Sequence, residues 1–129
     1  MAKPNVIPAL RYKHGAAAIE FLGKAFGFEK HFVVPGPTPD AVAHAQLVLG
    51  PGMIMLGSGR HDPPNPWDDV AQGIYVYVED VEAHYARARA AGAEIVMELY
   101  DTPYGSREYS ARDPEGHLWS FGTYDPWRS

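Results

Sequence analysis

The amino-acid sequence repeats one pattern of elements, and this repeat limits the fold more than any other feature. Two stretches carry apolar residues at helical spacing, and each has a glycine near its end, Gly27 or Gly92. These glycines lie 65 positions apart. Several further matches in the same register indicate an internal duplication. Without a gap, the offset aligns the strand-like residues 9–12 with 74–77 and residues 43–57 with 108–122.

Each copy of the repeat is predicted to contain a strand, a helix and three more strands. Between the copies, residues 58–72 are rich in Pro, Gly and Asp, which is typical of a linker. A sheet with a helix on one face leaves its other face open. We therefore expect an α+β fold, one domain over residues 1–129, in which two βαβββ repeats, residues 5–57 and 73–124, pair into a curved mixed sheet around a cleft. The expected strands are 6–12, 30–34, 43–49 and 53–57 in the first repeat, and 73–78, 94–99, 107–112 and 117–124 in the second.

Composition excludes several classes of function. The chain has no cysteine, which excludes disulfides, thiolate metal sites and cysteine nucleophiles. With 11 Lys and Arg against 16 Asp and Glu, the net charge is -5, so we expect no nucleic-acid partner. No apolar run is long enough to span a membrane, and the first ten residues are too short and interrupted for a signal peptide. These features favour a cytoplasmic protein without a membrane partner.

Two segments resemble the vicinal-oxygen-chelate superfamily, which includes glyoxalase I, bleomycin-resistance proteins, fosfomycin-resistance enzymes and extradiol dioxygenases. They are residues 18–29, AIEFLGKAFGFE, and residues 106–124, SREYSARDPEGHLWSFGTY. The resemblance covers about residues 5–125. It implies the paired βαβββ fold and a small-molecule ligand. Because members commonly form homodimers and the sheets have exposed edges, it also implies a homodimer.

The same resemblance implies a position for each of four metal ligands. Aligned through the first segment, these positions fall on Ile7, Gln46, Gly73 and Ser120. Ile and Gly offer no side-chain donor, and a serine hydroxyl is a poor neutral ligand. We therefore expect neither the usual metal nor another cofactor.

If Gly73 occupies a ligand position, strand alternation decides which side chains face the cleft. Aromatic rings, two methionines and a few polar groups would suit a flat, partly apolar organic ligand. The alternative is that tyrosine and methionine simply fill the core. The candidate ligand-binding residues are Arg11, His44, Gln46, Met53, Met55, Tyr75, Tyr77, Tyr109 and Ser120.

Two hypotheses for function follow from this set. The first is a metal-free binding protein that sequesters a drug or a toxic metabolite. The resemblance also implies that Arg11 holds an anionic group of the ligand, as an arginine does in some glyoxalases, and the alternative is an arginine at the surface or at a dimer interface. The second is a glyoxalase-type lyase or isomerase that uses displaced ligands around His44, Gln46 and Tyr109. His44 and Tyr109 could also form a proton-transfer pair, but a structural hydrogen bond is the more common role for such a histidine. Trp67, in the linker, could close over a ligand or pack against a second chain.

Overall fold

A computed structural model describes residues 4–59, 62–64 and 66–127 of the chain. The chain divides into two compact units, residues 1–71 and 72–129. Each contains a βαβββ module, which confirms the predicted α+β class. The first unit contains β1 (Ala9–Tyr12), α1 (Gly15–Phe21), the π-helical η1 (Leu22–Phe26), β2 (Glu29–Pro35), β3 (Val42–Leu49), β4 (Gly52–Ser58) and the 3-10 helix η2 (Pro66–Asp69). The second contains β5 (Gly73–Tyr77), α2 (Val81–Ala90), β6 (Glu94–Asp101), β7 (Arg107–Arg112) and β8 (Leu118–Gly122).

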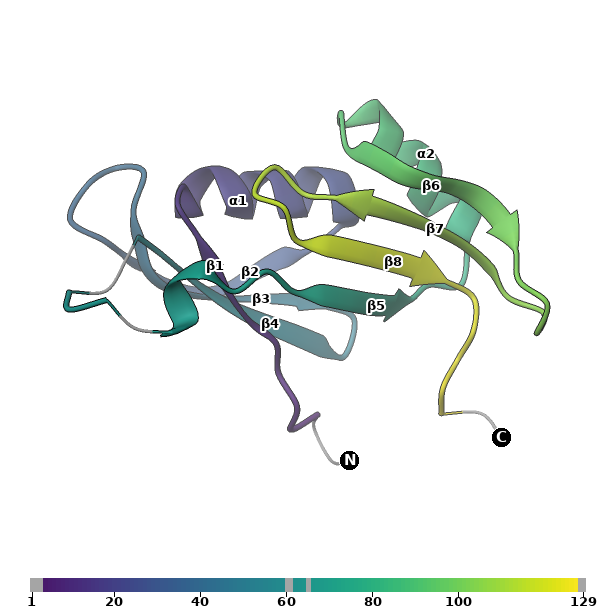
Figure 1. Ribbon diagram of the computed structural model, residues 1–129, viewed down its shortest axis with the longest axis horizontal. Coiled ribbons are helices and arrows are strands. Elements are labelled where there is room, and N and C mark those ends of the chain that lie inside the picture. Colours follow the sequence, from purple (N-terminus) through teal and green to yellow (C-terminus); the bar gives the residue numbers. More distant parts are fainter. Residues whose placement is uncertain (1–3, 60–61, 65, 128–129) are drawn as a thin grey trace. The chain divides into compact units, whose positions relative to one another are not determined.

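The two modules share one sheet topology (Figure 1). The strand order is β1-β4-β3-β2 in the first sheet and β5-β8-β7-β6 in the second. The first and last strands of each module pair in parallel, β1 with β4 and β5 with β8, whereas the other pairs are antiparallel. The helix between the first two strands belongs to the crossover, so only one face of each sheet is covered within its module.

The helices end where the sequence predicts. Gly27 and Gly92 adopt left-handed backbone conformations, with φ of 91° and 87°, which glycine accepts without strain. At the start of α2, Asp80 accepts a hydrogen bond from the Ala83 amide at 3.0 Å and satisfies one otherwise unpaired N–H group. The first helix differs from the prediction, because its second half, η1, is π-helical.

The core of each unit lies between its helix and the covered face of its sheet. In the first unit Leu10, Leu47 and Leu56 from the strands are buried, as are Leu22 and Phe26 from η1. In the second unit three aromatic side chains stack in a row. The Tyr109 and Phe121 rings lie 5.2 Å apart, and the Phe121 and Trp119 rings 6.4 Å apart. All three are fully buried.

The repeat does not keep a single offset throughout. In the parallel pairs, Ala9 lies opposite Met55 in the first unit and Tyr75 lies opposite Ser120 in the second. Ala9 therefore corresponds to Tyr75, 66 positions later, while Met55 corresponds to Ser120, 65 positions later.

The third strands shift in the other direction. Gln46 pairs with Met55, and Ser110 pairs with Ser120, so Gln46 corresponds to Ser110, 64 positions later. A shift of one residue in a strand moves every side chain to the opposite face. The gap-free offset of 65 is therefore wrong for β3 and β7, and this error changes the predicted site.

A buried carboxylate organises the predicted turn at residues 113–116. The Asp113 side chain is 2% exposed and accepts hydrogen bonds from Trp119 Nε1 at 3.1 Å and from the backbone amides of Glu115 and His117 at 3.0 and 3.1 Å. The turn thus ties the start of β8 to the buried indole of Trp119.

Replacing Asp113 by Asn tests this interaction. Whichever way the amide is oriented, its NH2 group faces an N–H donor, so we expect a loss of about 2 kcal/mol in the free energy of unfolding. Urea denaturation followed by tryptophan fluorescence measures the change. Asp101→Asn is the control, because that exposed carboxylate lies 3.9 Å from Arg107 and contributes less than about 1 kcal/mol. Equal effects of the two substitutions would contradict the assigned role of Asp113.

Candidate functional site

Five predicted ligand-binding residues lie together on one face of the first sheet. Alternation separates them from the buried neighbours Ala45, Leu47, Ile54 and Leu56, which face the helix. We call the other side the open face of the first sheet. The predicted residues on it are Arg11 from β1, His44 and Gln46 from β3, and Met53 and Met55 from β4. Their role in binding a ligand stays a prediction.

A cavity of about 250 Å³ occupies part of this face. Its size is slightly below the roughly 300 Å³ at which pockets for whole drug-like ligands begin, so it suits a fragment or one ring system of a larger ligand. The lining is mainly apolar, with one guanidinium and one imidazole. The lining residues are Ala9, Leu10, Arg11, Ala43, His44, Met55, Leu56, Gly57 and Trp67.

Trp67 is the residue of this cavity that no strand pattern could place. It belongs to η2, and its side chain is 55% exposed. It lines the cavity of its own unit, and its two predicted roles, closing over a ligand and packing against a second chain, both stay predictions. Because the indole is both a cavity wall and exposed, a bound aromatic group would contact it directly.

Backbone carbonyls hold Arg11 in the cavity. Its Nη2 donates to the carbonyl oxygens of Ser58 at 3.1 Å and Gly59 at 2.6 Å. Gly57 permits the close approach, because a Cβ there would lie 2.5 Å from Arg11 Nη1 and 3.1 Å from the Ala43 carbonyl oxygen. The guanidinium is thus oriented before any ligand arrives, which lowers the entropy cost of binding.

A short polar chain runs across the open face beside the cavity. His44 Nε2 lies 3.0 Å from Gln46 Oε1, and Gln46 Nε2 lies 3.9 Å from Met53 Sδ. Because a carbonyl oxygen only accepts, His44 donates through Nε2, and in the neutral imidazole Nδ1 is then the acceptor. This chain can orient a ligand donor at His44, which also lines the cavity.

In the second unit Tyr75, Tyr77 and Ser120 lie on the side of the sheet turned away from α2, as predicted. Tyr75 pairs with Ser120, and Tyr75 and Tyr77 are 38% and 43% exposed. We call this side the open face of the second sheet. It also carries Glu108, which lies on β7 opposite Gly122.

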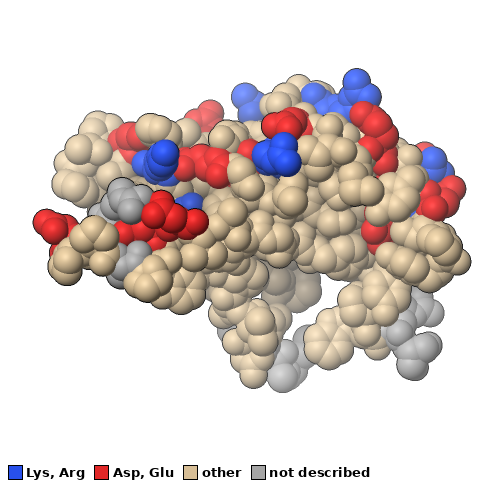
Figure 2. Space-filling model, in the orientation of Figure 1, with Lys and Arg blue, Asp and Glu red and all other residues tan. Residues whose placement is uncertain are grey.

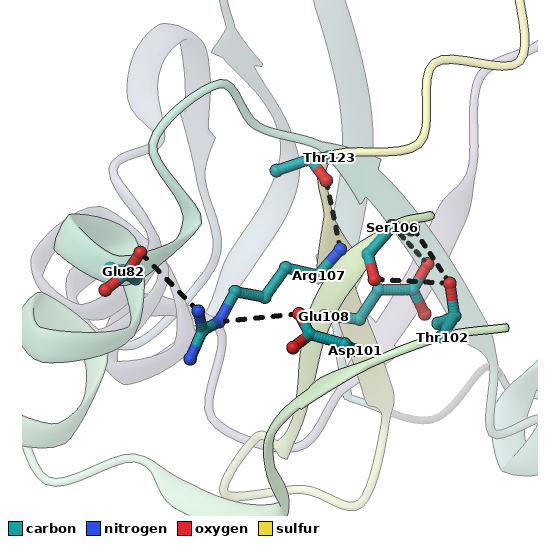
Figure 3. Close-up of polar contacts among 7 residues, drawn as sticks. All are labelled: Glu82, Asp101, Thr102, Ser106, Arg107, Glu108 and Thr123. Atoms are coloured by element: carbon teal, nitrogen blue, oxygen red, sulfur yellow. Dashed lines mark hydrogen bonds and ion pairs between the residues drawn. The ribbon is translucent and has the colours of Figure 1, made fainter. Parts of the chain in front are cut away.

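The prediction for Tyr109 is wrong. Its side chain is fully buried toward α2, with the hydroxyl oxygen 2.5 Å from His84 Nδ1, and burial raises the pKa of this phenol strongly. Arg107, two residues earlier on the same face of β7, reaches Glu82 of α2 at 3.9 Å (Figure 3). The displaced metal site and the proton-transfer pair with His44 both required Tyr109 on the open face, so both fail.

The register also corrects one of the four metal-ligand positions. Met55, and not Gln46, corresponds to Ser120. The four positions therefore hold Ile7, Met55, Gly73 and Ser120, which together offer one thioether and one neutral hydroxyl. Hard and borderline divalent cations need several N or O donors, so this set does not fit the metal that the fold family implies. Among the described residues, no group of three or more His, Cys, Asp or Glu could hold a metal ion.

The open face of the second sheet carries a cluster of one carboxylate and three hydroxyls that the sequence did not indicate. Glu108 is only 6% exposed and accepts hydrogen bonds from Ser106 Oγ at 2.9 Å and from the hydroxyls of Tyr100 and Tyr104 at 3.3 Å each. Figure 3 shows Glu108 and Ser106 on the opposite side of β7 from the Arg107 side chain. An offset of 64 would have found it, because Glu108 then corresponds to His44.

Charge is mixed over the surface shown in Figure 2. Lys and Arg side chains lie among Asp and Glu there and form no continuous basic surface. Within the part of the chain that the structure describes, no helix is both long and apolar enough to cross a membrane.

The fold, the open faces and the sequence together place this chain in a known family. Residues 6–121 match the Glyoxalase/Bleomycin resistance protein/Dioxygenase superfamily, and the chain belongs to it. An uncharacterized protein of Mycobacterium bovis is 34% identical over 127 residues, covering 93% of this chain and 83% of its own length.

Solved structures agree with this assignment. The crystal structure of TioX from Micromonospora sp. ML1 has a TM-score of 0.80 at 33% identity, with 92% of this chain and 97% of that chain covered. The lactoylglutathione lyase from Agrobacterium tumefaciens has a TM-score of 0.66 at 25% identity, with 94% and 95% covered.

The Tyr75 phenol provides a test of the second open face. Burial, and then the negative charge of Glu108, raise the pKa of Tyr75 to about 12. The ordinary value is about 10, so the folded state holds this proton more tightly, and the resulting stability is lost as pH rises from 10 through 12. Tyr75→Phe should leave the tyrosinate absorbance at 295 nm nearly unchanged below pH 11 in the native protein. In denaturant the same substitution should remove the absorbance change of one phenol that titrates near pH 10. Equal losses of absorbance in the native and the denatured protein would contradict this environment for Tyr75.

Proposed function

We propose that the protein binds a small organic ligand in the cavity of its first unit, without the metal of the glyoxalase-type members of its superfamily. The observation that carries the proposal is the combination of the apolar cavity with an oriented guanidinium at Arg11 and an exposed indole at Trp67. This combination suits an aromatic ligand that bears an anionic group. Sequestration of a drug or toxic metabolite is the physiological use that we propose.

The absence of a bound cofactor belongs to the same proposal. Its support is the donor chemistry of Ile7, Met55, Gly73 and Ser120, which suits no hard divalent cation. The lactoylglutathione lyase among the structural relatives keeps the enzymatic alternative in view. The version of it set out above needed Tyr109, however, and that hydroxyl lies beside His84 in the core.

We also propose a homodimer. Each sheet ends in edge strands, β1 and β2 in the first unit and β5 and β6 in the second. Phe32 and Val34 on β2 are 52% and 38% exposed. An edge strand with exposed apolar side chains favours association with another chain. A cytoplasmic location stays a prediction from the sequence.

The cavity can be tested with the fluorescent probe 1-anilinonaphthalene-8-sulfonate, which carries two aromatic groups and one anionic group. We expect the native protein to bind one probe per chain. Trp67→Ala should weaken binding about tenfold, because it removes an aromatic wall. Trp127→Ala is the matched control, since that indole is 95% exposed and lies outside the cavity. If both variants bind the probe as the wild type does, the cavity is not the site.

The neutral analogue N-phenyl-1-naphthylamine separates the role of Arg11 from that of the apolar walls. Arg11→Met should weaken the anionic probe by about tenfold and the neutral probe by less than about twofold, because only the charged interaction is lost. Equal weakening of both probes would show that Arg11 supports the cavity structurally.

Native mass spectrometry of protein purified without a chelator tests the metal and the assembly together. We expect a dimer without bound metal, because the four ligand positions lack suitable donors. One divalent ion per chain would overturn the metal-free proposal. A monomer at micromolar concentration would overturn the dimer and leave the cavity proposal unaffected.

A further inference from the structure

We propose that the open face of the second sheet holds a second binding site, which recognises an alkylammonium group through Glu108 and the tyrosines around it. The site is formed by Tyr75, Tyr100, Tyr104, Ser106, Glu108 and Tyr124. All six belong to the second unit, so the proposal does not depend on the cavity of the first.

The carboxylate of Glu108 is buried among neutral groups. It is 6% exposed, and every hydrogen bond to it from a described residue comes from a hydroxyl, those of Tyr100, Tyr104 and Ser106. None of the ion pairs between described residues includes Glu108. Hydroxyl donors reduce the cost of burying this charge but do not neutralise it. A cationic group would supply the missing opposite charge.

The hydroxyl donors remain neutral around the carboxylate. Desolvation, followed by the negative charge of Glu108, raises the pKa values of Tyr100 and Tyr104, and the same two causes act on Tyr75. The phenols around Glu108 therefore stay protonated over the whole physiological range. The composition of the cluster favours a cation over an anion.

The aromatic rings form exposed walls next to this charge. The Tyr104 and Tyr124 rings lie 5.7 Å apart at an interplanar angle of 76°, and their side chains are 64% and 47% exposed. Two nearly perpendicular rings make a corner, and the π-face of a phenol ring attracts an alkylammonium group. Strand pairing alone does not require large aromatic side chains to be exposed beside a buried carboxylate.

Backbone contacts hold the cluster in place. Ser106 Oγ accepts a hydrogen bond from the Tyr124 amide at 3.0 Å, and the Tyr75 hydroxyl donates to the Tyr124 carbonyl oxygen at 2.6 Å. The Ser106 amide donates to Thr102 Oγ1 at 2.9 Å and closes the turn between β6 and β7 (Figure 3). The walls and the carboxylate are therefore arranged in advance, which favours binding.

Choline and its neutral isostere 3,3-dimethylbutan-1-ol test the proposal, because they share a shape and differ in charge. Binding is followed through the backbone amide shifts of Gly105, Ser106 and Tyr124 in NMR titrations of the full chain. We expect choline to bind with a Kd on the order of millimolar, at least about fivefold more tightly than the alcohol. Equal affinities, or no shifts with choline, would overturn the proposal.

Two variants separate charge recognition from a purely structural role. Glu108→Gln should weaken choline binding at least about fivefold, whereas Glu79→Gln, which removes the same charge from an exposed position of this unit, should change it less than about twofold. Equal effects of the two substitutions would show that general surface charge attracts choline.

A second pair of variants tests the proposed site if Glu108→Gln fails to fold. Tyr104→Phe keeps the ring and should retain choline binding within about twofold, whereas Tyr104→Leu should weaken it at least about threefold. If the leucine variant binds choline as well as the phenylalanine variant does, the aromatic wall has no role and the proposed site is wrong.

Discussion

Parallel pairing between the first and last strand of each module is the constraint on which the structure depends. Joining β1 to β4, or β5 to β8, in parallel requires a crossover, and the helix lies in that crossover. The helix covers one face of the four-stranded sheet and leaves the other without a cover from its own module. A ligand site can then be built from alternate residues of several strands, on a sheet that the buried core of the opposite face holds rigid.

The two open faces use this common scaffold differently. The first carries an apolar cavity with Arg11 and His44, whereas the second carries Glu108 among phenol hydroxyls. His44 and Glu108 occupy corresponding positions of β3 and β7. The duplicated module thus provides one geometry, and corresponding positions of its two copies carry different side chains. The four positions at which the resemblance implies metal ligands hold Ile7, Met55, Gly73 and Ser120, which offer one thioether and one neutral hydroxyl.

Much of the fold was predictable because local chemistry decides it. The helix ends follow from Gly27 and Gly92, whose left-handed conformation suits glycine, and the start of α2 follows from the capping carboxylate of Asp80. Of the candidate site, the residues of β1, β3, β4, β5 and β8 were placed on the correct faces. Tyr109 on β7 was not, and one metal-ligand position was assigned to Gln46 instead of Met55, because a gap-free offset cannot represent different strand registers.

The sequence by itself determined the order of elements and the duplicated module, since these depend on residue types and local spacing. Tertiary structure decided which face Tyr109 and Glu108 occupy, because side chains alternate along a strand and a register shift of one residue exchanges the two faces. It also decided that Trp67 lines the cavity of the first unit. No local pattern could show this, because a residue outside the strands is positioned only by its contacts with distant parts of the chain.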